Sequence, residues 1–221
     1  KLSSETISVL QNFAKLNPGI EFKKGNVLRT MSTGKTVLAK TTLKDEFPHD
    51  FCVYDLNQFL SVHSLYKDAE IDFDESNIIF KSGRGKIKYR KTAKEMIVTA
   101  PDKNLTLPSV DVSFVLTEED LATILKSASV LQSTHIAVES EDNKIFLTCY
   151  CAKDDSAHTN TIEVGESSGV KFKSVYLTEQ MRMVVGPYDI DIMEKITHFK
   201  HGTQEIEYWI ANQVKESNFG E

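Results

Sequence analysis

SETISVLQNFAKL, residues 4–16, predicts the first element of the fold, and a stretch of the same type recurs as TEEDLATILKSASVL at residues 117–131. Each begins near a residue that commonly caps helices and carries apolar side chains at helical spacing. Each is followed by segments in which polar and apolar residues alternate, as in strands with one solvated face. This repeated order of helix and strands predicts two similar modules.

Two shorter helices complete the predicted modules, one from Asp55 to Tyr66 and one from Thr178 to Val185. Turn signals between the strand patterns, such as Ser32-Thr33-Gly34 and Asp142-Asn143, favour hairpins over parallel crossovers. The expected fold class is therefore α+β, with antiparallel sheets and two helices in each of two similar domains. We expect domain 1 at residues 1–100, an interdomain linker at residues 101–109 and domain 2 at residues 110–221.

The composition is that of a globular protein, with 40% hydrophobic and 26% charged residues. The apolar runs fall short of the roughly 20 residues that a membrane helix needs, so we expect a soluble, intracellular protein without membrane contact. The number of cysteines also favours an intracellular protein. Three cysteines, with Cys149 and Cys151 two apart in a strand pattern, are typical of unpaired thiols and not of a disulfide framework.

Charge is distributed unequally along the chain, whose net charge is −6. Residues 1–103 carry 17 bases and 13 acids, whereas residues 104–221 carry 9 bases and 19 acids. A basic half and an acidic half favour head-to-tail contact between copies, and such contacts form rings when the rotation closes. The alternative is that the charge imbalance is drift on solvated surfaces and does not bring copies together.

The polar faces of the predicted helices are unusual because, after the first turn, they carry Ser, Thr, Asn and Gln with one base each and no acid. Surface helices normally mix acids and bases. Weakly basic faces suit a water-filled contact with a polyanion such as DNA; ordinary solvent-facing helices are the alternative. The residues expected to face DNA are Gln11, Asn12, Lys15, Asn57, Ser61, Ser64, Lys67, Lys126 and Arg182.

The segment from Lys81 to Lys94 holds seven basic residues and no acid. Three interpretations are open: protection of an exposed sheet edge, contact with an acidic segment of a neighbouring copy, or contact with DNA. The acidic segments considered for a neighbouring copy are Glu163/Glu166 and Glu205/Glu207.

No catalytic, metal or nucleotide signature is complete. Ser32 to Thr36 imitates the end of a phosphate-binding loop, but Arg29 stands where the first glycine is required and a strand pattern follows. Cys149, Cys151 and His158 lack the second ligand pair of a zinc site, and His198 and His201 lack convergent carboxylates in any readable motif. We therefore expect no enzyme activity, cofactor or metal; a hydrolase using strand-end Asp and His is the weaker alternative.

Several short motifs in a fixed order carry a family resemblance along nearly the whole chain: LQNFA at residues 10–14, Pro18-Gly19-Ile20, YDLNQFL at residues 54–60, TAPDK at residues 99–103 before Leu107-Pro108, and Glu119-Asp120-Leu121. In these the chain resembles the DNA polymerase sliding clamps of large tailed bacteriophages of the myovirus type. The resemblance departs at the first helix, where Ser4 and Gln11 stand at positions at which the family often has Lys.

The resemblance implies a DNA clamp fold, assembled as a homotrimeric closed ring that encircles double-stranded DNA and is not an enzyme. It also implies an ATP-dependent clamp loader, the C-terminal peptide of the replicative DNA polymerase, and late-transcription sigma and coactivator proteins as partners. The expected role is processivity in viral DNA replication and DNA-tracking coactivation of late transcription, in the cytoplasm of the infected bacterial host. A replisome scaffold that binds proteins without enclosing DNA is the alternative.

Clamps bind partner peptides in a hydrophobic pocket beside the interdomain linker, so the resemblance directs attention to residues 101–109. An extended linker places Leu105 and Leu107 on one side. The expected partner-binding residues are Leu105, Leu107, Pro108 and Val110. A purely structural role, in which the leucines fasten the linker to the domains, is the alternative for each.

Overall fold

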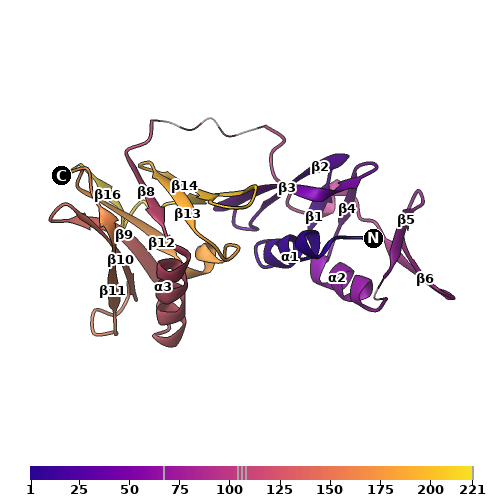
Figure 1. The fold of residues 1–221 in the computed structure, drawn as a ribbon, viewed down its shortest axis with the longest axis horizontal. Coiled ribbons are helices and arrows are strands. Elements are labelled where there is room, and N and C mark those ends of the chain that lie inside the picture. The colour runs from indigo at the N-terminus through magenta and orange to yellow at the C-terminus, as the bar shows by residue number, and fades with distance from the viewer. Residues whose placement is uncertain (67, 104, 106, 108, 221) are drawn as a thin grey trace. The chain divides into compact units, whose positions relative to one another are not determined.

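The computed structural model describes residues 1–66, 68–103, 105, 107 and 109–220 of the chain (Figure 1). It divides into two compact units, unit 1 at Lys1–Asp102 and unit 2 at Lys103–Glu221. This division falls inside the segment expected to be the linker, whose bounds of 101–109 stay a prediction. Strands within each unit pair antiparallel, as in the predicted α+β class.

Unit 1 packs two helices against short sheets. Its elements are α1 (Ser4–Phe13), β1 (Ile20–Phe22), β2 (Gly25–Met31), β3 (Val37–Phe47), β4 (Phe51–Val53), α2 (Leu56–Ser64), β5 (Glu70–Phe73), β6 (Asn77–Ser82), β7 (Gly85–Arg90) and a 3₁₀ turn at Lys94–Met96. Strand β1 pairs with β4, β2 with β3, and β5, β6 and β7 form a sheet in that order. Helix α1 packs against α2 and β3.

An aromatic cluster fills the core of unit 1. Phe22 stacks on Phe51 with ring centroids 4.6 Å apart, and Phe59 of α2 contacts Phe80 at 5.4 Å and Tyr89 at 5.7 Å. All five rings are buried. Because α2 reaches these rings through Phe59, its opposite face is left to solvent.

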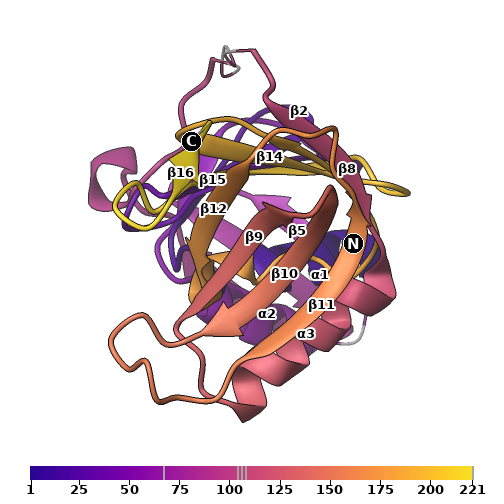
Figure 2. The ribbon, with the colours of Figure 1, turned by 90° about the vertical axis from the view of Figure 1, so that its left-hand side faces the viewer.

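Unit 2 contains two sheets and one α-helix. Its elements are β8 (Val112–Leu116), α3 (Glu118–Val130), β9 (His135–Glu141), β10 (Lys144–Tyr150), β11 (Asn160–Glu166), β12 (Phe172–Leu177), a 3₁₀ turn at Thr178–Met181, β13 (Tyr188–Ile192), β14 (Ile196–His201), β15 (Ile206–Ala211) and β16 (Asn218–Phe219). One sheet has the order β11-β10-β9-β12-β16, and β15-β14-β13-β8 are consecutive neighbours in the other. Helix α3 packs on β10 and β11, which Figure 2 shows side by side.

Three buried tyrosines and one phenylalanine lie at the centre of unit 2. Tyr176 and Tyr188 each contact Phe199, with ring centroids 5.8 and 6.3 Å away. The Tyr176 hydroxyl lies 2.7 Å from Thr197 Oγ1 and accepts a hydrogen bond from Ser174 Oγ at 2.9 Å. The Tyr176 side chain can therefore be buried away from water, because its hydroxyl has hydrogen-bond partners within the protein.

Two of the predicted helix starts are confirmed by their caps. The Asp55 carboxylate accepts a hydrogen bond from the Gln58 backbone N–H at 2.9 Å, and Thr117 Oγ1 accepts one from the Asp120 N–H at 3.1 Å. Such side-chain acceptors satisfy N–H groups that have no partner inside the helix. The first helix begins at the predicted Ser4, but its cap is Ser3.

The predicted fourth helix, Thr178 to Val185, is wrong in type and length, because only a 3₁₀ turn at Thr178–Met181 forms. After Met181 the chain finds hydrogen bonds outside a helix: the Val184 N–H donates to the Tyr208 hydroxyl at 3.1 Å, and the Met183 N–H donates to the Met181 carbonyl. Two successive β-branched residues, Val184 and Val185, also disfavour helix. Unit 2 therefore has one α-helix where unit 1 has two, within the described residues.

Candidate functional site

The exposed face of α1 is polar and uncharged, and one base, Lys15, continues it in the turn after the helix. Ser4, Ser8, Gln11 and Lys15 are exposed, and their spacing of four, three and four residues places them on one side. Thr6, Val9, Leu10 and Phe13 are buried on the other side. The structure therefore brings Gln11 and Lys15 together on a solvent-facing surface, as expected from the sequence.

Asn12 corrects the prediction for this face, because its side chain is only 6% exposed. It projects between the two faces of α1, where neighbouring residues cover it. Helical spacing alone does not decide whether a residue at this boundary is exposed, because that depends on which other elements pack against the helix. We therefore remove Asn12 from the candidate DNA-facing residues.

The start of α1 is fixed by Asp45 at the end of β3. Its carboxylate accepts hydrogen bonds from the Ser3 N–H and the Ser3 hydroxyl, both at 2.8 Å. Burial works against the charged form, but bonds from Thr6 and Ser3 outweigh it, so the pKa of Asp45 lies below its ordinary value. Helix α1 is thus oriented by a charged group that belongs to the sheet.

The exposed face of α2 carries Asn57, Ser61 and Ser64, as predicted. Ser61 Oγ donates to the Asn57 carbonyl at 2.8 Å, and Ser64 Oγ donates to the Ser61 carbonyl at 2.7 Å. Because both hydroxyl protons are used within the helix, the Asn57 amide is the side-chain donor that these three residues still offer to a phosphate. Lys67 lies outside the described residues.

In unit 2, Lys126 is exposed on α3 between Thr123 and Ser129, which are also exposed. Arg182 is exposed directly after the 3₁₀ turn and does not continue a helical face. A cavity of about 640 Å³ lies between the end of α3 and this turn, lined by Ala128, Met181 and Arg182 among others. The structure therefore places Lys126 on a helix and Arg182 on irregular backbone, and Arg182 but not Lys126 is among the residues that line this cavity.

The linker residues are only partly covered. Leu105 is 40% and Val110 is 45% exposed, Leu107 is half-buried, and Pro108 lies outside the described residues. A cavity of about 350 Å³ adjoins the linker's start and is lined by Lys23, Val27, Arg29, Ala100 and Asp102 among others. The predicted leucines are not among the described residues that line this cavity, so their role in partner binding stays a prediction.

Sequence reasoning missed a cluster on the solvent-facing side of the β8-β13-β14-β15 sheet. His198 stacks on Trp209 with ring centroids 4.9 Å apart, and its Nε2 lies 2.8 Å from Glu207 Oε2. Asp191 Oδ2 lies 3.8 Å from His198 Nδ1. No readable motif places carboxylates beside His198; strand register brings them together.

Trp209 itself carried a readable signal. Ile206, Tyr208 and Ile210 are buried in β15, so the chain's single tryptophan occupies the alternate, half-buried face of the strand. Its indole N–H is buried without a hydrogen-bond partner in the described part of the chain. A large aromatic residue on the solvated side of a strand is typical of a surface that receives a partner.

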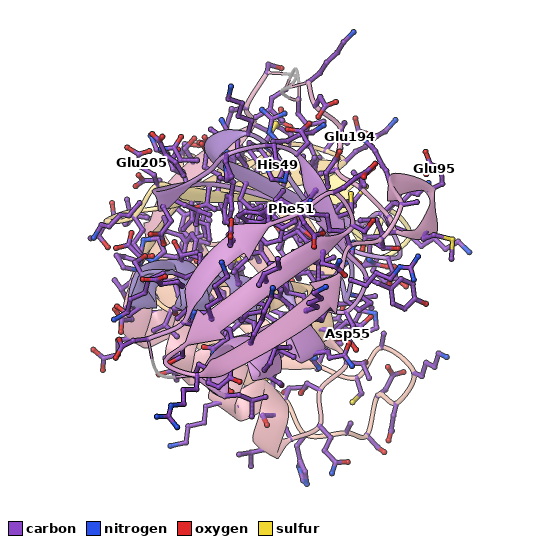
Figure 3. The ribbon with its side chains drawn as sticks, turned by 90° about the vertical axis from the view of Figure 1, so that its right-hand side faces the viewer. His49, Phe51, Asp55, Glu95, Glu194 and Glu205 are labelled. Atoms are coloured by element: carbon purple, nitrogen blue, oxygen red, sulfur yellow. The ribbon has the colours of Figure 1, made fainter. Side chains whose placement is uncertain are left out.

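Two open sheet edges carry opposite charge. Strand β7 is an edge of the β5-β6-β7 sheet, which faces the viewer in Figure 3. Its Lys86, Lys88 and Arg90 are exposed and, counting only described residues, form no ion pair within 4.0 Å, although Lys86 and Lys88 act on Asp72 and Asp74 over a longer distance. Strand β11 is an edge in unit 2 and exposes Glu163 and Glu166.

Three of the four remaining bases of the Lys81–Lys94 segment are engaged inside unit 1, and the fourth, Arg84, is exposed at the turn before β7. Lys81 pairs with Asp72 at 2.9 Å, Lys94 pairs with Glu21 at 2.9 Å, and Lys91 donates to the Asp74 carbonyl at 2.7 Å. Free basic charge is therefore concentrated along the β7 edge. Within the described ranges, the His198 cluster included, no group of His, Cys, Asp and Glu could hold a metal ion, and no helix is long and apolar enough to cross a membrane.

Comparison with known proteins adds family relationships to this geometry. A family model described as DNA polymerase processivity factor matches residues 3–99. The sliding clamp of Vibrio phage KVP40 is 32% identical over 97% of this chain and 99% of its own length, and that of Escherichia phage RB69 is 35% identical over 72% and 70%. The structure of A. fulgidus PCNA with the C-terminal region of FEN-1 bound has a TM-score of 0.67, 14% identity and 94% coverage of each chain.

Proposed function

Because this chain belongs to the sliding clamps, which are DNA polymerase processivity factors and not enzymes, we propose that three copies form a closed ring around duplex DNA. The ring tethers the replicative polymerase of a bacteriophage to its template during replication in the infected host's cytoplasm. The observation that carries this proposal is the pair of open, oppositely charged edges, β7 and β11.

Edge pairing between copies extends one sheet into the next. An exposed edge has unpaired N–H and C=O groups that bond readily to another strand. If β7 of one copy lies antiparallel to β11 of the next, the half-buried Ile87 of β7 can fall on the same face as the half-buried Ile162 of β11. The opposite face then places Lys86, Lys88 and Arg90 of one copy against Glu163 of its neighbour. The bulge in β11 between Glu163 and Gly165 brings Glu166 onto the same face as Glu163.

This contact is heterologous, because it joins two different surfaces of the same chain. Heterologous contacts generate closed rings when the rotation per copy divides a full turn. Each chain supplies one basic and one acidic edge, so a closed ring leaves neither edge free. The number of copies, three, rests on the family resemblance.

DNA in the bore would meet the exposed faces of α1, α2 and α3. Each phosphate neutralised by a base contributes roughly 0.9 to the salt dependence of binding, and these faces offer Lys15 and Lys126 with uncharged neighbours. So few contacts do not hold duplex DNA tightly at physiological salt. Retention would come from enclosure, and weak contacts would permit sliding.

Partner peptides would dock at the linker and at the cluster of Trp209, His198 and Glu207. The structure of A. fulgidus PCNA with the C-terminal region of FEN-1 bound supports peptide capture by a protein of this fold. Trp209 is half-buried and would offer the exposed part of its ring as an apolar surface to a peptide. We propose the C-terminal segment of the replicative polymerase as one occupant, an ATP-dependent clamp loader as another partner, and late-transcription factors as users of the loaded ring.

Retention on DNA tests the proposal. After loading by the cognate clamp loader, the ring is expected to stay on nicked circular DNA and to be lost once that DNA is linearised, because a free end releases a threaded ring. Sedimentation is expected to give three times the 24.9 kDa mass of one chain. Equal retention on both DNA forms, or a chain-sized mass at micromolar concentration, would instead favour a scaffold that does not enclose DNA.

A further inference from the structure

We infer that Arg29 is a positioning residue for partner binding, because it fixes the point at which the linker leaves unit 1. From β2, its Nη1 donates to the Pro101 carbonyl at 3.2 Å and to the Asp102 carbonyl. These are the last two residues of unit 1. The inference rests on the proposed role of the linker in receiving partner peptides.

The segment before these carbonyls is held independently. Asn17, which is 2% exposed, donates from Nδ2 to the Val98 carbonyl and to the Met31 carbonyl, both at 2.8 Å. Ile97 packs so closely on Gly19 that a Cβ there would lie 2.5 Å from Ile97 Cγ2. Loss of the Arg29 bonds would therefore free residues 99–102 while Ile97 and Val98 stay anchored.

Other contacts to the linker's start are weaker. Lys23 Nζ lies 3.8 Å from Asp102 Oδ1, and the two side chains are 37% and 71% exposed. Lys23 is also 2.9 Å from Glu21 and 3.3 Å from Asp50. An exposed pair at such a distance contributes little. The two bonds from one guanidinium nitrogen are therefore the main restraint on Pro101 and Asp102.

Anchoring at Asp102 shortens the tether of the predicted partner-binding leucines. Leu107 is five residues from Asp102 and nine from Val98. Leu105 is three residues from Asp102 and seven from Val98. The effective concentration of a tethered group falls roughly as the −3/2 power of tether length. Moving the anchor from Asp102 to Val98 is therefore expected to lower the local concentration of these side chains about two- to fourfold.

Arg29→Met tests the inference, because Met keeps much of the aliphatic length and removes the donors. The assay is binding of the full chain to a fluorescent peptide with the C-terminal sequence of the phage's replicative polymerase. We expect binding to weaken about two- to fourfold, with faster hydrogen exchange in residues 99–103 and unchanged exchange in β3. Arg84→Met, at an exposed turn, is the matched control and is expected to change neither.

Two further variants keep the outcome decisive. Insertion of Gly-Ser-Gly-Ser after Lys103 lengthens the tether to Leu107 from five to nine residues without touching Arg29, and should weaken binding to the same extent. Leu107→Asp tests the linker site itself. If Leu107→Asp weakens binding but Arg29→Met and the insertion do not, the linker site stands and the inference is overturned; if Leu107→Asp has no effect, both fall.

Discussion

His198 stacks on Trp209 with ring centroids 4.9 Å apart and an angle of 11° between the rings. Glu207 lies within hydrogen-bonding distance of the His198 Nε2 at 2.8 Å, so the imidazole is held from one side by a carboxylate and from the other by the indole. A side chain already fixed in the free protein loses little conformational entropy when a partner covers it. This preorganisation makes Trp209 the strongest candidate anchor on the solvated face of its sheet.

Trp209→Ala is expected to weaken binding of the polymerase peptide by about 2 kcal/mol or more, roughly thirtyfold, because truncated aromatic anchors account for much of the binding energy of interfaces. Calorimetric titration of the full chain measures the change. Tyr54→Ala is the control, since Tyr54 is a 59% exposed aromatic residue of unit 1 outside the proposed site. Equal affinities for the Trp209 variant and the unmodified chain would remove this cluster from the partner site.

Lys126→Gln is expected to reduce the electrostatic attraction to DNA without releasing the ring. The slope of log affinity against log salt concentration for the assembled ring should fall by up to about 0.9 for each phosphate that the variant no longer neutralises. Retention on circular DNA should not change, because enclosure does not depend on this base. Lys153→Gln makes the same charge change at an exposed loop of unit 2. If both variants give the same slope, α3 does not face DNA.

Local features of the fold were predictable because they depend on neighbours in sequence. The caps Asp55 and Thr117 lie three residues from the N–H groups that donate to them. The absence of the fourth helix depends on a distant contact, since the Tyr208 hydroxyl that accepts a hydrogen bond from the Val184 N–H is 24 residues away. Helix propensity does not include that competitor.

The residues of the candidate sites also divide into those that sequence predicts and those that depend on distant contacts. Exposure of Gln11, Lys15 and Lys126 follows from helical period alone. Burial of Asn12, the pairing of His198 with Trp209 and the bonds from Arg29 to the linker depend on strand register and packing between segments distant in sequence. The basic Lys81–Lys94 segment lies between these cases: its charge was visible, but only the structure shows which bases are already paired.

Alkaline pH is expected to destabilise unit 2. Burial raises the pKa of Tyr176 to about 12, although hydrogen bonds with Ser174 and Thr197 act in the opposite direction, and burial also raises the pKa of Tyr188 and Tyr208. Tyrosine in the unfolded chain titrates near pH 10. The unfolded state therefore loses protons first, and stability that is complete below pH 10 falls as the pH rises toward 12.

The expected loss from Tyr176 alone is about 2–3 kcal/mol, since each unit of pKa shift corresponds to about 1.4 kcal/mol. Denaturant unfolding followed by the fluorescence of Trp209 measures it, because the single tryptophan reports on unit 2. Tyr176→Phe should flatten the decline between pH 10 and 12, whereas Tyr54→Phe, at an exposed position, should leave it unchanged. A midpoint that stays constant up to pH 12 would contradict this account.

The edge contact between β7 and β11 predicts a charge-swap rescue. Lys88→Glu and Glu163→Lys should each weaken trimer association about fivefold or more, because each places like charges on facing edges, and the double variant should recover most of the loss. Sedimentation equilibrium measures the association constants.

Glu163 also bonds to Lys144 within its own chain at 2.7 Å. The decisive quantity is therefore the coupling between the two changes and not the effect of either change alone. Arg84→Glu alters the same basic segment at the turn before β7 and should have little effect. Additive losses in the double variant would show that these edges do not meet.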